Sequence, residues 1–453
     1  MTKDYKYLEH TSSICPICKG KIDAKIIEKD DSIFILKYCS EHGEFCAILE
    51  EDAVYYNNRK LYDKPGNLFA CQTPRHDGCP FDCGLCPEHE QHTCVGLIEI
   101  TSNCNLKCPV CFANSEKGDF LPLTTFEKML DFYVESEGGK SDILQISGGE
   151  PTIHPEIIQF VALARTKNIS YVLINTNGVR IAEDIEFVKE LSQFKGGFEI
   201  YLQFDGFDDS IHTYLRGKSL WEIKQKAVEN LQKYNIPVTL VTTLERGIND
   251  KEIGKIIEYG MSINCVRGIN FQPVGYFGRL PESNTANRLT ITSVIKKIEE
   301  QTSSMIRKSD FIPLPCNVDR VAITYFYKDK TNSFIPLTRN IDIKKYLPFI
   351  KNTLKFDPDD FLKELTSDIF SKDCCNAMGL FKEVAKYIPV NYIFKSEDEK
   401  IKYISDNTFR ISITSFVDVY NFDIKSVQKE CVHFITPELK KIPFSTFNIF
   451  HRK

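Results

Sequence analysis

Short apolar runs alternate with longer amphipathic stretches between residues 94 and 280. The apolar runs have the length of buried strands, and the stretches between them repeat apolar positions at helical spacing. Strands and helices that alternate in this way are typical of βα units around a parallel sheet. Six strands fit an open barrel better than a complete eightfold one, so we predict an α/β fold with a partial (β/α)6 barrel and keep a doubly wound sheet as the alternative. The predicted strands are 95–101, 142–147, 170–175, 198–204, 237–243 and 266–272, and the predicted helices are 125–135, 155–166, 181–193, 220–234 and 249–259.

The pattern changes on both sides of this barrel, which we assign to residues 95–280. Residues 1–70 combine a CPIC pair with an extended, β-rich stretch and predict a small mononuclear iron or zinc module. Residues 71–94 are dense in Cys, Pro, Gly and His and lack periodicity, so something other than an apolar core must fix them. Residues 281–453 mix both periodicities and predict an α+β region that binds substrate or caps the barrel.

The cysteines are unevenly distributed along the chain. Twelve of the 17 lie before residue 112, and the next one is Cys265. Disulfides could account for such a density in a small secreted domain. The opening MTKDYKYLEH contains no apolar signal segment, so we expect a cytoplasmic protein. Clustered, closely spaced cysteines in such a protein indicate metal binding.

Charge and hydropathy narrow the classes of partner. The chain has 62 acidic and 57 basic residues, and the resulting net charge of −5 argues against nucleic-acid binding. It contains no run of about 18 apolar residues, so we expect no transmembrane helix. Peripheral contact with a membrane surface needs no such helix, and we allow for it.

The strongest chemical motif is TSNCNLKCPVCF at residues 101–112. It places Cys104, Cys108 and Cys111 on one loop directly after a predicted strand. Three thiolates can hold three irons of a [4Fe–4S] cluster and leave the fourth iron open to another ligand, whereas a ferredoxin-like carrier supplies four cysteines. Zinc is the alternative metal, because closely spaced cysteines also bind zinc.

Polar groups follow the next predicted strands at the same end. The segment ISGGEP places Gly148, Gly149 and Glu150 after the second strand, and glycines allow the backbone to approach a ligand closely. NTNG, QFDG and NFQPVG end the third, fourth and sixth strands. Because the carboxyl ends of barrel strands converge on one face, these groups jointly predict one ligand site.

This set of motifs resembles the radical S-adenosylmethionine enzymes over about residues 94–280. The resemblance implies that Cys104, Cys108 and Cys111 hold a catalytic [4Fe–4S] cluster whose open iron binds S-adenosylmethionine. It also implies a 5′-deoxyadenosyl radical that abstracts hydrogen from unactivated carbon, and a low-potential electron donor such as ferredoxin. The implied cofactor-binding residues are Gly148, Gly149 and Glu150 for the amino group, Asn175, Gln203 and Asp205 for the ribose and carboxylate, and Gln272 near the adenine.

A narrower resemblance, to the archaeal tetraether lipid synthase group, rests on GCPFDCGLCPEHEQHTC together with CPIC, CSEHG, CVHF and IPF. It implies an enzyme that couples isoprenoid lipid chains into tetraether or macrocyclic lipids and therefore contacts the membrane. Relatives of this group have been described as pterin methylases, so modification of a small polar substrate such as a pterin is the alternative. The resemblance also implies an auxiliary [4Fe–4S] cluster on Cys79, Cys83, Cys86 and Cys94, with a zinc knuckle as the other possibility.

The same resemblance implies a mononuclear iron or zinc site on Cys15, Cys18 and Cys39. The fourth ligand could be His42, which gives a CxxH pair, or Cys46, which gives a rubredoxin-like set of four thiolates. We favour His42, because CxxH is a common second half of a zinc knuckle. We then expect Cys46 to be a small core residue.

The C-terminal region departs from the group's pattern, in which PC…PxC and IPFC segments supply further cysteines. Ser445 stands where IPFSTFN would have a cysteine. Cys316, Cys374, Cys375 and Cys431 could still bind a second auxiliary cluster. The alternative is that they are buried thiols of a metal-free cap.

Overall fold

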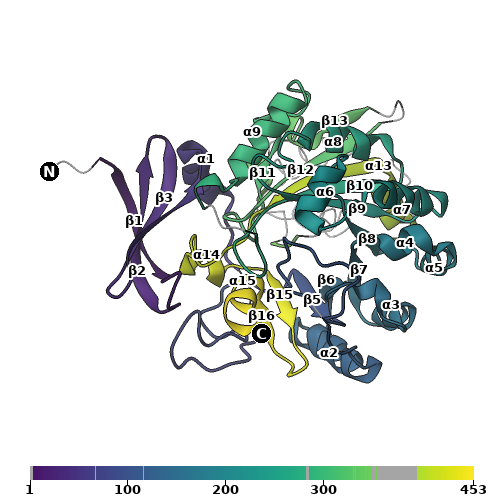
Figure 1. Cartoon of the computed structure of the whole chain (residues 1–453), viewed down its shortest axis with the longest axis horizontal. Coiled ribbons are helices and arrows are strands. Elements are labelled where there is room, and N and C mark those ends of the chain that lie inside the picture. The colour runs from purple at the N-terminus through teal and green to yellow at the C-terminus, as the bar shows by residue number, and fades with distance from the viewer. Residues whose placement is uncertain are drawn as a thin grey trace, which may run out of the picture.

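The computed structural model describes residues 4–66, 68–115, 117–281, 285–329, 331, 333–341, 343–347, 352–354 and 395–452. Figure 1 shows a small purple N-terminal sheet beside a larger sheet that is flanked by helices, with yellow C-terminal elements adjoining both. Cys374 and Cys375, two of the four cysteines considered for a second auxiliary cluster, lie outside the described residues.

The N-terminal sheet is antiparallel, and its four strands follow one another in chain order. Ile26 and Ile33 on one of its faces pack against Ala53 and Tyr56 of the helix that follows. This apolar cluster is small, so the sheet depends on further contacts for its stability. Its elements are β1 (Lys6–Ile14), β2 (Lys21–Lys29), β3 (Ser32–Cys39), β4 (Gly43–Glu50), α1 (Ala53–Asn58) and η1 (Arg59–Tyr62).

Buried polar contacts anchor this sheet on the C-terminal segment. Nζ of Lys37 donates to the carbonyl of Ile14 at 2.9 Å and to the carbonyl of Val419 at 2.7 Å. The hydroxyl of Ser13 donates to the carbonyl of Phe422 at 2.6 Å. These hydrogen bonds hold the loop that follows β1 in a fixed place relative to the C-terminal segment.

All six predicted barrel strands are present close to their predicted bounds, and they pair in parallel and in chain order. The prediction of one helix over 181–193 was wrong, because Asp184 ends one helix and caps the next by accepting from the Phe187 amide at 3.0 Å. The helix over 209–216 was not predicted. The barrel elements are β5 (Val95–Glu99), α2 (Leu123–Ser136), β6 (Ser141–Ser147), η2 (Pro151–Ile153), α3 (Ile157–Thr166), β7 (Ile169–Thr176), α4 (Val179–Glu183), α5 (Ile185–Leu191), β8 (Phe198–Gln203), α6 (Asp209–Arg216), α7 (Trp221–Lys233), β9 (Val238–Leu244), α8 (Ile253–Ser262) and β10 (Val266–Pro273).

The C-terminal region extends the barrel sheet at both edges. β14 (Thr408–Thr414) pairs in parallel with β10. β15 (Val432–Ile435) pairs in parallel with β5, and these two strands lie side by side in Figure 1. The region therefore shares one sheet with the barrel. Its other elements are η3 (Thr285–Asn287), α9 (Ile291–Gln301), η4 (Lys308–Asp310), β11 (Ile312–Pro313), β12 (Val321–Lys328), β13 (Phe334–Pro336), η5 (Leu337–Arg339), α10 (Ile343–Tyr346), α13 (Glu397–Asn407), α14 (Ile424–Gln428), β16 (Lys441–Pro443), α15 (Phe444–Thr446) and the π-helix η8 (Phe447–His451).

The two faces of the barrel sheet differ sharply in polarity. On β8, Ile200 and Leu202 belong to the core between the sheet and its helices, so Tyr201 and Gln203 point to the opposite, inner face. The same alternation runs through the neighbouring strands and places mostly polar side chains on the inner face, together with Leu97, Ile143, Leu173 and Val241. Within the described residues, no helix combines the length and apolar character needed to cross a membrane. The polar inner-face side chains include Ser147, Tyr171, Asn175, Glu199, Tyr201, Gln203, Thr239, Thr243, Asn270, Gln272, Arg410, Ser412 and Thr414.

Candidate active site and metal centres

The three-cysteine motif follows β5 and turns across the carboxyl end of the barrel strands. Cys108 is buried with Leu106 and Leu220, and Cys104 and Cys111 pack beside them and are half-buried. Burial raises the pKa of Cys104 to about 12, and the charges of Glu150 and of the neighbouring cysteines add to this. The structure thus brings the three predicted thiols together, where a bound metal would displace their protons.

Hydrogen bonds hold this loop in place. They come from a segment in which the sequence showed no motif. Arg279 and Cys111 exchange backbone hydrogen bonds of 2.9 and 3.0 Å. Nε of Arg279 also donates to the carbonyl of Cys108 at 2.7 Å. Arg279 follows β10, the last barrel strand. It therefore ties the cysteine loop, which follows the first barrel strand, to the end of the barrel.

Gly148 and Gly149 meet the cysteine loop at its start. A Cβ on Gly148 would lie 2.2 Å from the carbonyl oxygen of Thr101, and one on Gly149 would lie 2.2 Å from that of Asn103. The amide of Gly149 donates to the Thr101 carbonyl at 2.8 Å. These glycines therefore allow a close approach to the backbone segment that precedes Cys104.

Glu150 is buried and ties three loops together. Its carboxylate accepts from the Thr176 hydroxyl at 2.7 Å and from the Asn177 amide at 2.7 Å, and both donors lie at the carboxyl end of β7. The side chain of Asn177 donates to Oδ1 of Asn105 at 2.7 Å, on the cysteine loop. Burial raises the pKa of Glu150, although these hydrogen bonds oppose the effect. Glu150 thus positions the loop ends around the predicted cofactor site.

The carboxylate of Asp205 is held by protein groups. It accepts two bonds from the guanidinium of Arg216 and a third from the Thr243 amide at 3.0 Å. Burial raises the pKa of Asp205, but the charge of Arg216 prevails and holds it below its usual range. Because both carboxylate oxygens are occupied, Asp205 orients Arg216, whose charge lies near Cys108 and opposes the rise that burial causes in the pKa of that thiol.

Lys224 on α7 is a buried cation that the sequence reasoning missed. Its Nζ donates to the carbonyl of Asn177 at 2.6 Å. Burial lowers its pKa to about 8, and the charge of Asp205 opposes that effect. Lys224 shares the buried face of α7 with Ala227 and Val228, so a lysine at an apolar position of the helical repeat was the available signal.

The remaining predicted cofactor residues lie on the inner face. Asn175 donates to the hydroxyl of Ser147 at 3.4 Å, and Gln272 donates to the hydroxyl of Tyr201 at 3.4 Å. Gln203 ends β8 on the same face and is half-buried. The carboxyl ends of β6, β7, β8 and β10 therefore direct polar groups into one region, as the motifs predicted.

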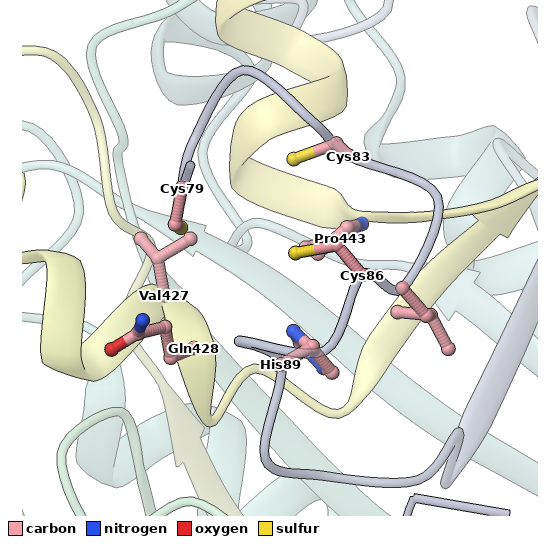
Figure 2. Close-up of a pocket in the computed structure, with 8 residues that line it drawn as sticks. Cys79, Cys83, Cys86, His89, Val427, Gln428 and Pro443 are labelled. Carbon is pink, nitrogen blue, oxygen red and sulfur yellow. The ribbon is translucent and has the colours of Figure 1, made fainter. Parts of the chain in front are cut away.

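Three of the four cysteines predicted for the auxiliary cluster line one pocket. Figure 2 shows Cys79, Cys83 and Cys86 gathered there, with His89 and residues of the yellow C-terminal segment. Burial raises the pKa of Cys83 to about 12 and lowers that of His89 to about 4. The Cys83 thiol is thus protonated and the His89 imidazole neutral when no metal is bound.

Cys94 lies in a different group from the one predicted. Its sulfur clusters with those of Cys316 and Cys431, all three within 4.8 Å of one another. The sulfurs of Cys431 and Cys316 are 3.9 Å apart, and the Cys94 amide donates to the Cys431 carbonyl at 2.9 Å. This backbone bond leads into the pairing of β5 with β15, which only the folded chain creates. The group could hold a metal ion.

The N-terminal sheet brings together Cys15, Cys18, Cys39 and His42. The Cys18 and Cys39 sulfurs are 4.0 Å apart, and Nδ1 of His42 is 3.5 Å from the Cys39 sulfur. Two thiolates on one tetrahedral zinc would be about 3.8 Å apart. Cys46 lies on β4 and is exposed, so the expectation that it is a core residue was wrong. The structure therefore favours His42 as the fourth ligand.

Comparison with known proteins agrees with this architecture. A model of the radical SAM superfamily matches residues 98–260, and a model of the HMPTM N-terminal zinc ribbon domain matches residues 7–51. The chain is 36% identical over 477 aligned residues to a 7,8-dihydro-6-hydroxymethylpterin dimethyltransferase from Methanocaldococcus jannaschii, which spans 98% of this chain and 94% of that protein. It is 25% identical over 231 residues to a GTP 3′,8-cyclase from Alkaliphilus oremlandii, across 50% of this chain and 71% of that one. A crystal structure of Streptococcus suis SuiB bound to S-adenosylmethionine aligns with a TM-score of 0.38 at 16% identity, over 48% of each chain. The chain belongs to the radical SAM superfamily: it is a radical S-adenosylmethionine enzyme with an N-terminal zinc ribbon.

Proposed function

We propose that this enzyme methylates a pterin, with 7,8-dihydro-6-hydroxymethylpterin as the first substrate to test. The single observation that carries the proposal is the polar inner face of the barrel. The relative that matches nearly the whole chain is named as a dimethyltransferase of that pterin, which supports the same choice. The coupling of isoprenoid lipid chains receives no comparable support.

Hydrogen-bonding groups line this face from one strand to the next. The Thr414 hydroxyl donates to the side-chain oxygen of Asn270 at 3.2 Å, and Asn270 donates in turn to the hydroxyl of Tyr201. Deeper in the barrel, Arg410 donates to the buried carboxylate of Glu199 at 2.9 Å. An isoprenoid chain laid here would leave the remaining donors and acceptors of these groups without partners, which costs free energy. A pterin carries donors and acceptors of its own.

We assign S-adenosylmethionine to the carboxyl end of the same strands. Cys104, Cys108 and Cys111 would hold the [4Fe–4S] cluster, which when bound supplies the electron that cleaves the sulfonium to methionine and a 5′-deoxyadenosyl radical. The loop of Gly148 and Gly149 would face the amino group, together with Glu150. We assign Asn175 and Gln203 to the ribose and carboxylate, Gln272 to the adenine, and a low-potential donor such as ferredoxin to the electron supply. Asp205 would act indirectly, through Arg216.

The other metal centres complete the assignment. Zinc fits the ribbon in residues 1–70, because three thiols and an imidazole at tetrahedral spacing are a common structural zinc set. Residues 71–94 would hold an auxiliary iron–sulfur cluster beside the barrel of residues 95–280. Residues 281–453 would close that cluster and extend the sheet.

The proposal is tested with anaerobically reconstituted enzyme, S-adenosylmethionine, a strong reductant and the dihydropterin. The expected product carries one or two methyl groups in place of hydrogen, and S-adenosylmethionine labelled in its methyl group identifies the source of the carbon. A parallel reaction receives diether lipid. A product lighter by two hydrogens for each new carbon–carbon bond in that reaction, without change in the pterin, would overturn the proposal.

Two variants separate chemistry from folding. Cys108→Ala should abolish deoxyadenosine formation, because a three-cysteine loop has no spare ligand. Cys46→Ser changes an exposed thiol outside every candidate centre and should leave product formation unchanged.

A further inference from the structure

The pocket of Cys79, Cys83 and Cys86 contains a fourth donor that the cysteine count overlooks. His89 lines the same pocket, three positions after Cys86 (Figure 2). The four donors thus repeat at short spacing along one loop, and the loop is closed by Val427, Gln428 and Pro443 of the C-terminal segment.

The proton on the His89 ring can be placed from its surroundings. Nε2 of His89 lies 2.9 Å from the backbone carbonyl of Glu430. Because a carbonyl oxygen only accepts, Nε2 carries the hydrogen and donates. The neutral ring then has its lone pair on Nδ1, and the backbone carbonyl of Gln91 also lies close to the ring. A ring that donates one nitrogen to a backbone carbonyl and leaves the other unprotonated is the usual arrangement of a metal-ligating histidine.

A second buried histidine supports this arrangement. Nε2 of His433 is 2.8 Å from the same Glu430 carbonyl and 3.0 Å from Nε2 of His89. The Nε2 atoms of both rings thus lie within hydrogen-bond distance of that oxygen, and the hydroxyl of Thr93, 2.9 Å away, can donate to Nδ1 of His433. One assignment of protons therefore satisfies both rings and fixes the orientation of His89.

The carbonyl that orients both rings is itself held in place. Ser445 donates to the Glu430 carboxylate through its hydroxyl at 2.7 Å and through its amide at 3.0 Å. Cys94, by contrast, does not line this pocket. Its sulfur lies among those of Cys316 and Cys431.

We propose that His89 is the fourth protein ligand of the auxiliary centre on Cys79, Cys83 and Cys86, and that Cys94 belongs to a separate group. This inference rests on the auxiliary cluster proposed above and concerns metal ligation only. Replacement of a thiolate by a neutral imidazole removes one negative charge from the centre, and histidine ligation raises the potential of an iron–sulfur cluster. The auxiliary cluster should therefore be easier to reduce than one with four cysteines.

The test uses the full-length chain purified anaerobically, with Cys104, Cys108 and Cys111 all replaced by alanine. That background removes the catalytic cluster, whose bound S-adenosylmethionine would contribute a nitrogen signal of its own. Pulsed EPR on the reduced protein, with and without 15N-labelled histidine, should show a strongly coupled histidine nitrogen. The signal should disappear in His89→Cys, while iron and sulfide content is retained and the midpoint potential falls.

Cys94→Ser is the matched control and should keep both the nitrogen coupling and the iron. Nitrogen coupling that survives His89→Cys, or a cluster that is lost in Cys94→Ser, would overturn the ligand assignment. Absence of iron and sulfide from the background protein would overturn it as well, together with the auxiliary cluster. Failure to methylate the dihydropterin would leave these readouts unchanged, so the two proposals fail separately.

Discussion

The guanidinium of Arg216 donates to both oxygens of the Asp205 carboxylate, from Nε at 2.7 Å and from Nη2 at 2.8 Å, and both side chains are buried. The pair links the segment after β8 to the C-terminal end of α6, and Arg216 lies near Cys108. Bidentate geometry fixes the plane of the guanidinium as well as its distance. The cation near the cysteine loop therefore depends on the carboxylate that orients it.

Asp205→Asn keeps the shape of this side chain and removes its charge. The uncompensated cation left behind should lower the free energy of unfolding by about 3–5 kcal/mol, because a buried charge has lost its partner. Anaerobic urea unfolding measures the change. Glu186→Gln, which breaks an exposed pair with Lys189, is the control and should cost less than about 1 kcal/mol. Equal losses in the two variants would show that the buried pair has no special role.

The contact between Gly148 and the cysteine loop gives a second prediction. Gly148→Ala would place a methyl group 2.2 Å from the Thr101 carbonyl at a backbone φ of +141°, so the loop must shift. We expect a loss of about 1–3 kcal/mol in stability together with weaker S-adenosylmethionine binding. Gly139→Ala also has positive φ but meets no atom within 4 Å, so it carries the backbone strain alone. Calorimetric titration that finds equal affinity in the two variants would contradict the proposed role of the loop.

The sequence predicted the barrel well, because its strands and helices follow clear apolar patterns and each motif is local. It did not predict that the Cys94 sulfur lies with those of Cys316 and Cys431 and not with Cys79. That arrangement depends on β15 pairing with β5 across more than 300 residues of chain. The role of His89 was missed for the same reason, because its orienting carbonyl comes from Glu430. Lys224 was missed because a lysine within an amphipathic helix ordinarily faces water. Spacing thus identified the donors, and long-range packing decided their grouping.

Lys224 gives a prediction about pH. Burial lowers its pKa to about 8 in the folded chain from an ordinary value of 10.5. Between these values the unfolded chain binds more protons than the folded one, so stability should rise with pH across this window, by at most about 1.4 kcal/mol per pH unit. Urea unfolding from pH 8 to pH 10 should show this rise to be smaller in Lys224→Met. Lys226→Met removes an exposed lysine from the same helix and should follow the native chain; identical slopes for the native chain and Lys224→Met would refute the assignment.

The zinc ribbon offers a prediction with a built-in control. His42 closes a set of four donors within 4.8 Å, whereas Cys46 is an exposed residue of β4 outside that set. His42→Ala should lower bound zinc to well under one ion per chain, because the three thiols that remain as ligands should retain the metal poorly. Since structural zinc binding contributes about 10–16 kcal/mol to folding in small zinc domains, even a partial loss should unfold β1–β4 locally. Hydrogen exchange should then speed up in residues 6–50, while the barrel strands stay protected. Cys46→Ser should keep its zinc and its protection; loss of zinc from this variant would move the fourth ligand to Cys46 and give the rubredoxin-like set instead.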